Sequence, residues 1–185
     1  MRDIHASAGQ TINLINAFLD VAKIEQGTFA AEIQNIDINN IANNILKELA
    51  ESIQKKELNI IKEYGPGAPL VKIDPKLARI ILQNLITNAI NYTPAKGQIN
   101  VKIDINSREL KIMVKDTGIG IPKAQQENVF KKLFRAQNVK KETPGSGLGL
   151  YMSKTLLEQI NGKIWFESKE GQGTAFFAVI PQSNK

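Results

Sequence analysis

Two short stretches of alternating apolar and polar residues, close together in the chain, constrain the fold most. They are "QINVKIDI" (98–105) and "RELKIMVKD" (108–116), joined by "NSR". A period of two is typical of half-buried strands, and so short a connection favours antiparallel pairing. The sequence therefore predicts a β-hairpin here, which argues against a doubly wound parallel sheet.

The remaining elements are helices interspersed with strands. Strands are predicted at 31–38, 57–64, 70–73, 163–168 and 173–180, and helices at 39–56, 74–92 and about 148–160. Asp74 followed by Pro75 is a typical helix start, an N-cap acid before a proline at the first helical position. Strands that come as hairpins, with helices between them, indicate an α+β fold: a two-layer α/β sandwich with a mixed, mostly antiparallel sheet.

Composition limits the class of protein. The 185 residues are enough for one domain with a short appendage, and no run of eighteen apolar residues predicts a membrane span. The first ten residues do not resemble a signal peptide. The absence of cysteine excludes disulfides and thiolate metal sites and fits a reducing compartment. The net charge of +6 would suit a nucleotide, a nucleic acid or an acidic surface, but its scattered lysines favour ordinary solvated surface.

Residues 3–26 are predicted to form one helix that precedes the sandwich. Ile4, Ala8, Thr11, Ile15, Phe18 and Ala22 recur at spacings of four and three, and Gly27 follows as a helix stop. So wide an apolar face favours a partner helix, in another copy of the chain or in additional sequence. Packing of this helix on its own domain is the alternative.

The helix 74–92 carries an unusual polar face. Gln83, Asn84, Thr87, Asn88 and Asn91 fall within an arc of about 140°, where a solvated helix normally has charged residues. Asparagine is a poor helix former, so the pattern lowers helix stability. The amides either bond to neighbouring loops or face a ligand, since amide oxygens are hard ligands suited to magnesium and tolerate burial better than charges.

Two glycine-containing stretches could approach a ligand closely. "DTGIGIP" (116–122) follows a strand, so Asp116 is an acceptor at a strand end beside two glycines. "PGSGLGL" (144–150) opens a helix, where backbone N–H groups favour phosphate. The second stretch matches neither a Walker A loop nor a dinucleotide fingerprint. Alone, the first stretch could be an ordinary turn, whereas the second still indicates phosphate binding.

Between these stretches lies "VFKKLFRA" (129–136), with Phe130 and Phe134 one helical turn apart. It predicts either a small surface helix held by two aromatic rings or part of a mobile lid. A lid with glycine hinges would carry Lys131, Lys132 and Arg135 towards a triphosphate.

In this order, the four stretches resemble the catalytic ATP-binding domain of sensor histidine kinases from two-component systems, in the GHKL superfamily. "NLITNAINYTP" is similar to the N box, "DTGIGIP" to the G1 box, "VFKKLFR" to the F box and "GSGLGL" to the G2 box. The final "GKIWFESKEGQGTAFFAVIP" resembles the family's closing strands, and the resemblance covers about 33–181. It implies a Bergerat-type ATP-binding fold over residues 31–185 and a protein-histidine kinase that uses ATP and Mg²⁺.

The resemblance also implies roles for individual residues. Asn88 would bind magnesium with Asn84 nearby, Tyr92 would lie along the phosphates, and Asp116 would accept the adenine amino group, supported by Thr174. Gly118 and Gly120 would form one lid hinge, with Gly145, Gly147 and Gly149 forming the hinge on the phosphate side. Arg135 would approach the γ-phosphate and act with Asn88 in catalysis. Further nucleotide contacts are implied for Asn91, Ile121, Lys131, Phe134, Ser146 and Leu148.

Residues 1–30 are similar to the end of the second helix of the family's dimerisation and phosphoacceptor hairpin. The acceptor helix is not recognised in the chain, and His5 lacks the acidic neighbour and downstream proline typical of the acceptor motif, which favours a surface or interface histidine. The implied partners are ATP, the dimerisation hairpin in a homodimer and a response-regulator receiver domain, with no nucleic acid. The implied location is cytoplasmic, with membrane attachment only through upstream segments.

Two departures from the family pattern affect the functional interpretation. Asn91 stands where many members have a basic residue that touches phosphate, so the contact that replaces it is left open. Asn84 stands where the superfamily's hydrolytic ATPases have a glutamate, and an amide cannot act as a general base. This favours phosphoryl transfer to a protein over ATP hydrolysis. A module that senses ATP or docks a partner without phosphotransfer is the alternative function.

Overall fold

The computed structural model describes residues 32–65, 70–139, 143 and 145–182. The predicted helix 3–26 and His5 lie outside the described residues, as does the proposed first domain, 1–30. The division of the chain at residue 30 therefore stays a prediction. Within the described ranges, no helix combines the length and the apolar character needed to cross a bilayer.

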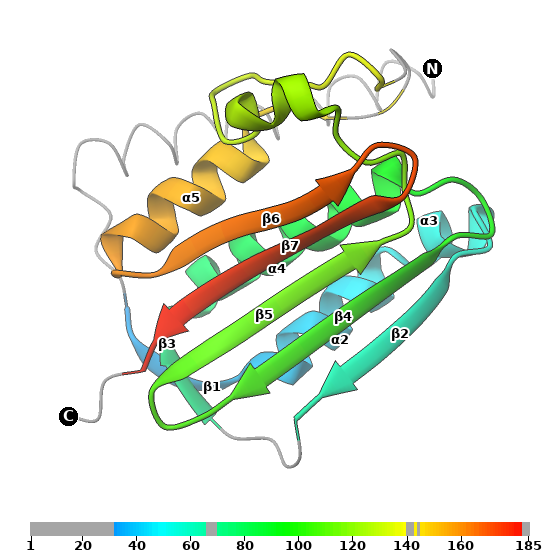
Figure 1. The fold of residues 1–185 in the computed structure, drawn as a ribbon. Helices are drawn as coiled ribbons and strands as arrows, with labels where there is room; N and C mark the ends of the chain where they lie inside the picture. The colour runs from blue at the N-terminus through cyan, green and yellow to red at the C-terminus, as the bar shows by residue number, and fades with distance from the viewer. Residues whose placement is uncertain (1–31, 66–69, 140–142, 144, 183–185) are drawn as a thin grey trace, which may run out of the picture.

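The main sheet has five strands, with β5 at its centre (Figure 1). In spatial order they are β2 (Asn59–Tyr64), β4 (Gln98–Ile105), β5 (Glu109–Asp116), β7 (Gly173–Pro181) and β6 (Lys163–Lys169). β2 and β4 run parallel, and the other neighbouring strands run antiparallel. A separate antiparallel pair consists of β1 (Gln34–Asp37) and β3 (Leu70–Ile73).

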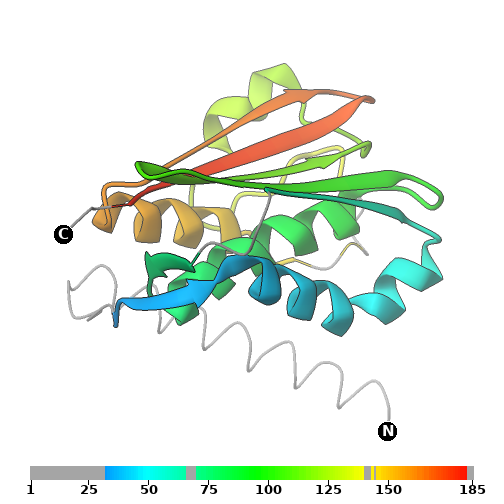
Figure 2. The same ribbon diagram turned by 90° about the horizontal axis from the view of Figure 1, so that it is seen from below.

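Helices cover one face of this sheet, as Figures 1 and 2 show. They are α2 (Ile38–Glu48), α3 (Ala50–Lys55), α4 (Pro75–Tyr92) and α5 (Gly149–Gln159). The apolar core lies between the two layers, and α4 contributes eight buried residues to it. The predicted α+β sandwich with a mixed, mostly antiparallel sheet is confirmed.

The predicted hairpin is the β4–β5 pair, in which Ile99 lies opposite Asp116. Its turn is closed by the Asn106 side chain, whose Oδ1 accepts the N–H groups of Arg108 at 2.8 Å and Glu109 at 3.0 Å. This register places Asp116 at the end of the central strand, beside the C-terminal end of α4 (Ile119 N to Tyr92 O, 3.2 Å).

The predicted single helix over 39–56 is wrong, because the structure divides it into α2 and α3 at Leu49 (φ −91°, ψ 6°). Ile41, Ile45, Leu49 and Ile53 recur every four residues through this region, and this spacing is what predicts one helix. The side chains still face the core on both sides of the break, since Ile45 is buried before it and Ile53 packs against the core after it. The surface helix considered for 129–136 is also wrong. These residues form turns, after a short 3₁₀ helix at Lys123–Asn128.

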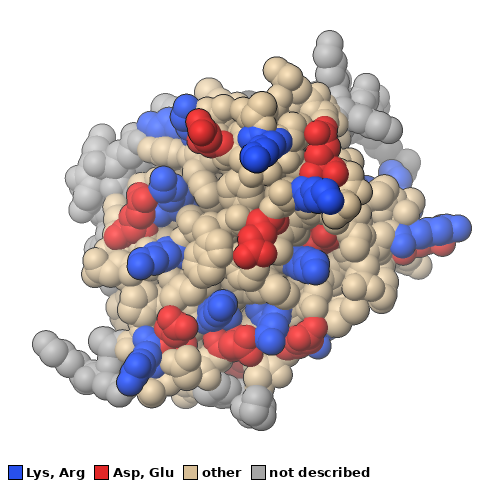
Figure 3. Space-filling model, in the orientation of Figure 1, with Lys and Arg blue, Asp and Glu red and all other residues tan. Residues whose placement is uncertain are grey.

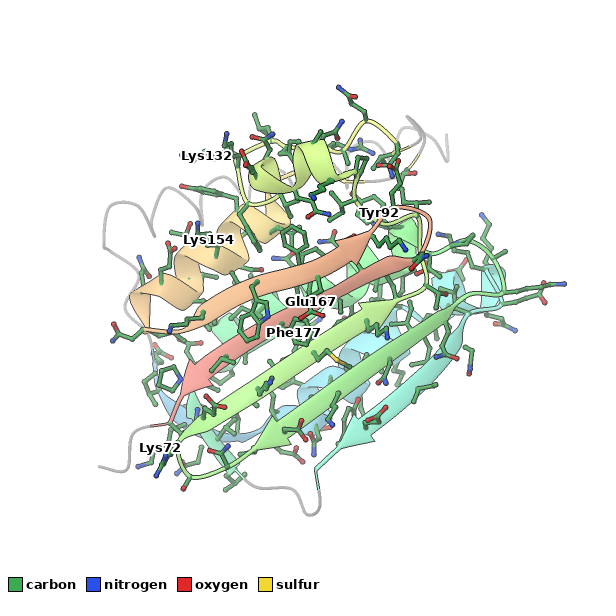
Figure 4. The ribbon with its side chains drawn as sticks, in the orientation of Figure 1. Lys72, Tyr92, Lys132, Lys154, Glu167 and Phe177 are labelled. Carbon is green, nitrogen blue, oxygen red and sulfur yellow. The ribbon has the colours of Figure 1, made fainter. Side chains whose placement is uncertain are left out.

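The face of the sheet that points away from the helices carries a mixture of charges (Figure 3). Lysine and arginine alternate there with aspartate and glutamate, so the positive charge is dispersed on this face. Phe177 and Glu167 lie on it (Figure 4), and the Phe177 ring stacks on Trp165 at 5.2 Å. This arrangement differs from the concentrated basic stripe of a nucleic-acid surface.

The start of α4 predicts a measurable difference between two helix caps. Asp74 is 2% exposed and accepts the N–H groups of Lys76, Leu77 and Glu32, whereas the half-buried Asp37 caps α2 with two bonds. We expect Asp74→Ala to lower the free energy of unfolding by about 2–3 kcal/mol and Asp37→Ala by about 1 kcal/mol. Urea denaturation measures the free energy of unfolding of both variants. Equal losses would contradict the prediction that the buried cap, Asp74, stabilises the protein more than Asp37.

Candidate functional site

A cleft opens where the ends of α4 and β5 meet the segment 119–139. Its empty volume is about 560 Å³, including space open to solvent. Eight of the residues predicted to bind nucleotide line it: Asn88, Tyr92, Asp116, Gly120, Ile121, Phe134, Arg135 and Thr174. The structure thus brings together residues from the N, G1 and F boxes and from the closing strands, which are far apart in the sequence.

Asp116 is a buried acid on the wall of this cleft. Its side chain is 5% exposed, and its Oδ1 accepts the N–H groups of Gly118 at 2.8 Å and Thr174 at 3.2 Å. Burial raises its pKa to about 6, while these two backbone hydrogen bonds act in the opposite direction. Oδ2 has no hydrogen-bond partner among the described residues, so it is the oxygen available to a ligand's N–H group.

Thr174 and Ser168 support this acid from β7 and β6. The Thr174 hydroxyl bonds the Ser168 hydroxyl at 2.8 Å, and Ser168 Oγ also accepts the Ile121 N–H at 2.9 Å. Gln126 Nε2 donates to the carbonyl oxygens of Ile121 and Ser168, both at 3.1 Å. The loop after Asp116 is therefore tied to the β6–β7 hairpin. Sequence reasoning missed Ser168, which lies in the closing stretch but was given no role there, and Gln126, which lies outside the four boxes.

Asn88 and Tyr92 form the α4 wall of the cleft, one helical turn apart. Figure 4 shows Tyr92 near the C-terminal end of this helix. Burial raises the pKa of Tyr92, and the charge and hydrogen bond of Arg135 oppose that rise. Arg135 also donates to the carbonyl oxygen of Thr143 at 2.6 Å. The guanidinium is thus held at the cleft, beside the Tyr92 hydroxyl.

Phe134 and Phe130 attach segment 129–136 to the domain. Phe134 lines the cleft, and the Phe130 ring lies 5.8 Å from that of Phe166 on β6. Lys131 and Lys132 are exposed, and the Lys132 ammonium lies 5.0 Å from the centre of the Tyr151 ring on α5. The role of this segment as a lid that carries Lys131 to phosphate stays a prediction.

Asn84 lies behind the cleft rather than on its wall. Its Nδ2 donates to the Gly149 carbonyl at 3.0 Å and to Ser153 Oγ at 3.1 Å. A Cβ on Gly149 would lie only 2.9 Å from Asn84 Oδ1, so this glycine permits the close contact. Asn84 therefore joins α4 to the start of α5. Its partners are in another helix, whereas the sequence suggested either neighbouring loops or a ligand.

Backbone geometry accounts for several of the predicted glycines. Gly120 has φ +63°, and a Cβ there would overlap the Lys169 carbonyl. Gly147 has φ +72°, and a Cβ would come within 2.6 Å of the Leu133 backbone. Both glycines thus let the loops on either side of segment 123–139 pack against neighbouring backbone.

The remaining predicted contacts lie beside the cleft. Helix α5 begins after Leu148 with no side-chain cap, which leaves N–H groups of its first turn for another acceptor, and its Leu150 lines the cleft. Ser146 Oγ accepts the Leu148 N–H at 3.2 Å. Asn91 and Lys131 are not among the described residues that line the cleft, so their predicted contacts with nucleotide stay predictions.

Comparison with known proteins matches the part of the chain that contains the cleft to a protein family. The family model for histidine kinase-, DNA gyrase B- and HSP90-like ATPases matches residues 73–184. The chain is 31% identical to the circadian input-output histidine kinase CikA of Synechococcus elongatus, over 98% of the chain and 24% of that protein. It is 30% identical to the sensor protein kinase WalK of Staphylococcus epidermidis, over 92% of the chain and 28% of that protein. It thus spans about a quarter of the length of each relative.

Solved structures show the same fold. The nucleotide-free catalytic domain of the histidine kinase ThkA superposes with a TM-score of 0.71 at 26% identity, covering 82% of this chain and 98% of that domain. Full-length ShkA, solved in complex with AMPPNP, has a TM-score of 0.82 at 22% identity, covering 97% of this chain and 37% of ShkA, and this likeness concerns the fold alone. Together with the family match over more than half of its length, these findings show that the chain belongs to the histidine kinase-, DNA gyrase B- and HSP90-like ATPase family.

Proposed function

We propose that this chain is the catalytic ATP-binding domain of a sensor histidine kinase and positions Mg-ATP for phosphoryl transfer to a histidine. One observation carries the proposal: a buried acid, Asp116, and an amide, Asn88, lie on different walls of one cleft, with Arg135 at the same cleft. Such a cleft offers separate groups for the base and for the phosphates of a nucleotide.

Asp116 would recognise adenine. Its Oδ2 would accept a hydrogen bond from the exocyclic amino group, while Oδ1 stays bonded to Gly118 and Thr174. Ile121, Val129 and Phe176 supply apolar surface for the flat ring. A base that offers a carbonyl oxygen in place of the amino group would set two acceptors against each other, so this end of the cleft would discriminate against it.

The other wall would hold the phosphates and the metal ion. The Asn88 amide oxygen fits magnesium, which commonly takes one or two protein ligands and completes its shell with phosphate and water. No three His, Cys, Asp or Glu side chains cluster among the described residues, which is consistent with such a sparse protein ligand set. When bound, magnesium would neutralise phosphate charge, and Tyr92, Arg135 and the first turn of α5 would orient the chain of phosphates.

The reaction would place a histidine nitrogen in line with the γ-phosphorus. A nitrogen–phosphorus bond forms, the bond to the β–γ bridging oxygen breaks, ADP leaves and the imidazole loses a proton. Hydrolysis would need a base that activates water. Asn84, at the position where hydrolytic members have glutamate, instead donates its amide to Gly149 and Ser153. This supports transfer to a protein, from which an aspartate of a response-regulator receiver domain would take the phosphoryl group.

Asn88→Ala should weaken Mg-ATP binding at least about tenfold, because the variant loses the proposed metal ligand. Isothermal titration calorimetry with and without EDTA should show that most of the loss depends on magnesium. Gln83→Ala is the matched control on the same helix, because Gln83 does not line the cleft, and it should bind almost as tightly as the parent. Parent-like Mg-ATP affinity in Asn88→Ala would remove Asn88 from the site.

Asp116→Asn should make the unliganded protein more stable while weakening adenine binding. The folded-state pKa of about 6 lies above the ordinary pKa of an aspartate, 3.8, so the folded state binds more protons between these values and loses stability as pH rises through them. Above about pH 6 the ionised acid costs up to about 3 kcal/mol, part of which the neutral amide should recover. Denaturation at pH 7.5 and 5 should show a gain that is larger at pH 7.5. A loss at pH 7.5 would contradict this electrostatic account.

The affinity for adenosine, which carries no phosphates, should fall as the pH drops below about 6 in the parent. Protonation of Asp116 removes the carboxylate acceptor, so the dissociation constant should rise by up to about tenfold per pH unit well below the pKa. Asp116→Asn is the control, since its affinity should not follow this titration. Adenosine binding by the parent that is flat from pH 8 to 5 would argue against Asp116 as the adenine acceptor.

Phosphotransfer itself is tested by mixing the chain with labelled ATP and a separate histidine-kinase hairpin that carries an acceptor histidine. We expect acid-labile, base-stable label on the hairpin, with none when its histidine is replaced by glutamine. Tight ATP binding without label on the hairpin would favour the ATP-sensing or docking module instead.

A further inference from the structure

Helix α4 ends inside the protein, close to the cleft. The last four carbonyl groups of a helix lack partners within it, and the last turn of α4 contains no basic residue to offset its negative end. The N–H and hydroxyl groups of Thr93 both donate to Ala89, at 3.0 and 2.6 Å. The remaining carbonyl groups need donors from elsewhere in the chain.

Lys56, at the C-terminal end of α3, supplies most of these donors. Its ammonium Nζ lies 2.6 Å from the Ile90 oxygen, 2.9 Å from the Asn91 oxygen and 3.0 Å from the Thr93 oxygen. An ammonium has three N–H donors, and three carbonyl groups surround this one. The lysine is half-buried, so the bonds form in a partly desolvated position.

The carbonyl between these, that of Tyr92, is bonded from the other side. It accepts the Ile119 N–H at 3.2 Å, and a Cβ on Gly118 would lie 2.5 Å from it. The loop that follows Asp116 is therefore packed directly on the last turn of α4. Any movement of this turn would shift Tyr92 relative to Asp116, on two walls of the cleft.

The main chain of Lys56 fixes the same region. Its carbonyl oxygen accepts the Lys96 N–H at 2.8 Å, and three residues later the Asn59 N–H donates to Gly97 at 2.9 Å. The segment that leaves α4 for β4 is thus held by both the backbone and the side chain of the α3–β2 connection.

We propose that Lys56 is a positioning residue for the nucleotide: its ammonium holds the last turn of α4 against the Asp116 loop, so that Asn88 and Tyr92 keep their places opposite Asp116. Lys56 does not line the cleft and would act through the α4 carbonyl groups. The proposal rests on the proposed function, because the positioned ligand is Mg-ATP.

Lys56→Met tests this, since it keeps much of the side-chain length and removes all three donors. We expect the dissociation constant for Mg-ATP to rise about tenfold at a temperature where both proteins are fully folded. Amide hydrogen exchange at Ile119 should become about tenfold faster, because its acceptor turn loosens, while exchange at Val114 in the sheet centre stays unchanged. Lys55→Met removes the exposed neighbouring lysine and should match the parent in both measurements.

A lower melting temperature with parent-like Mg-ATP affinity and Ile119 exchange would overturn the proposal, since Lys56 would then only stabilise the fold. If Lys56→Met does not fold, Lys56→Gln takes its place. This variant retains an amide donor but no charge, and parent-like affinity in it would also overturn the proposal. The two proposals fail in different ways. If the parent does not bind Mg-ATP, the proposed function is wrong. If the parent and Lys56→Met bind Mg-ATP equally well, only the role of Lys56 is wrong.

Discussion

The structure depends on the hydrogen bonds that satisfy the last carbonyl groups of one helix, α4. Helix α4 is buried along its apolar face and stops beside the central strand, where its last carbonyl groups cannot all be left to solvent. Donors from three parts of the chain meet them: Lys56 directly after α3, Thr93 after the helix and Ile119 after Asp116. The cleft forms where these segments converge, so the same bonds that terminate α4 bring its polar face next to the buried acid.

Local patterns predicted the fold well because each element carries its own signal. Asp74 and Pro75 mark the start of α4, and the alternation around Asn106 marks the hairpin, as the structure has them. The break at Leu49 was missed because apolar spacing continues through it, and only the backbone conformation at Leu49 shows it. Alternatives for 129–136 could not be separated from the sequence, since Phe130 and Phe134 pack on distant partners rather than on a helix of their own.

For the site, the motifs identified the residues that face the cleft but not those that hold them. Asn88, Tyr92, Asp116 and Arg135 lie in recognisable boxes, and the structure places them at one cleft. Asn84 belongs to the same box yet bonds to α5, because a helical wheel gives direction and not the partner. Lys56 and Ser168 carry no sequence signal, since their partners are main-chain groups and a hydroxyl brought close only by folding.

The raised pKa of Asp116 also makes the cleft a site of proton exchange. Near pH 6, in the absence of ligand, the Asp116 carboxyl group is protonated in about half of the molecules. A ligand that donates a hydrogen bond to this group binds preferentially to the ionised form. Entry of adenine would therefore expel a fraction of a proton. The heat of binding would then depend on the ionisation enthalpy of the buffer. Nucleotide binding and protonation of Asp116 are therefore linked equilibria, because burial of the end of β5 raises the pKa of this acid.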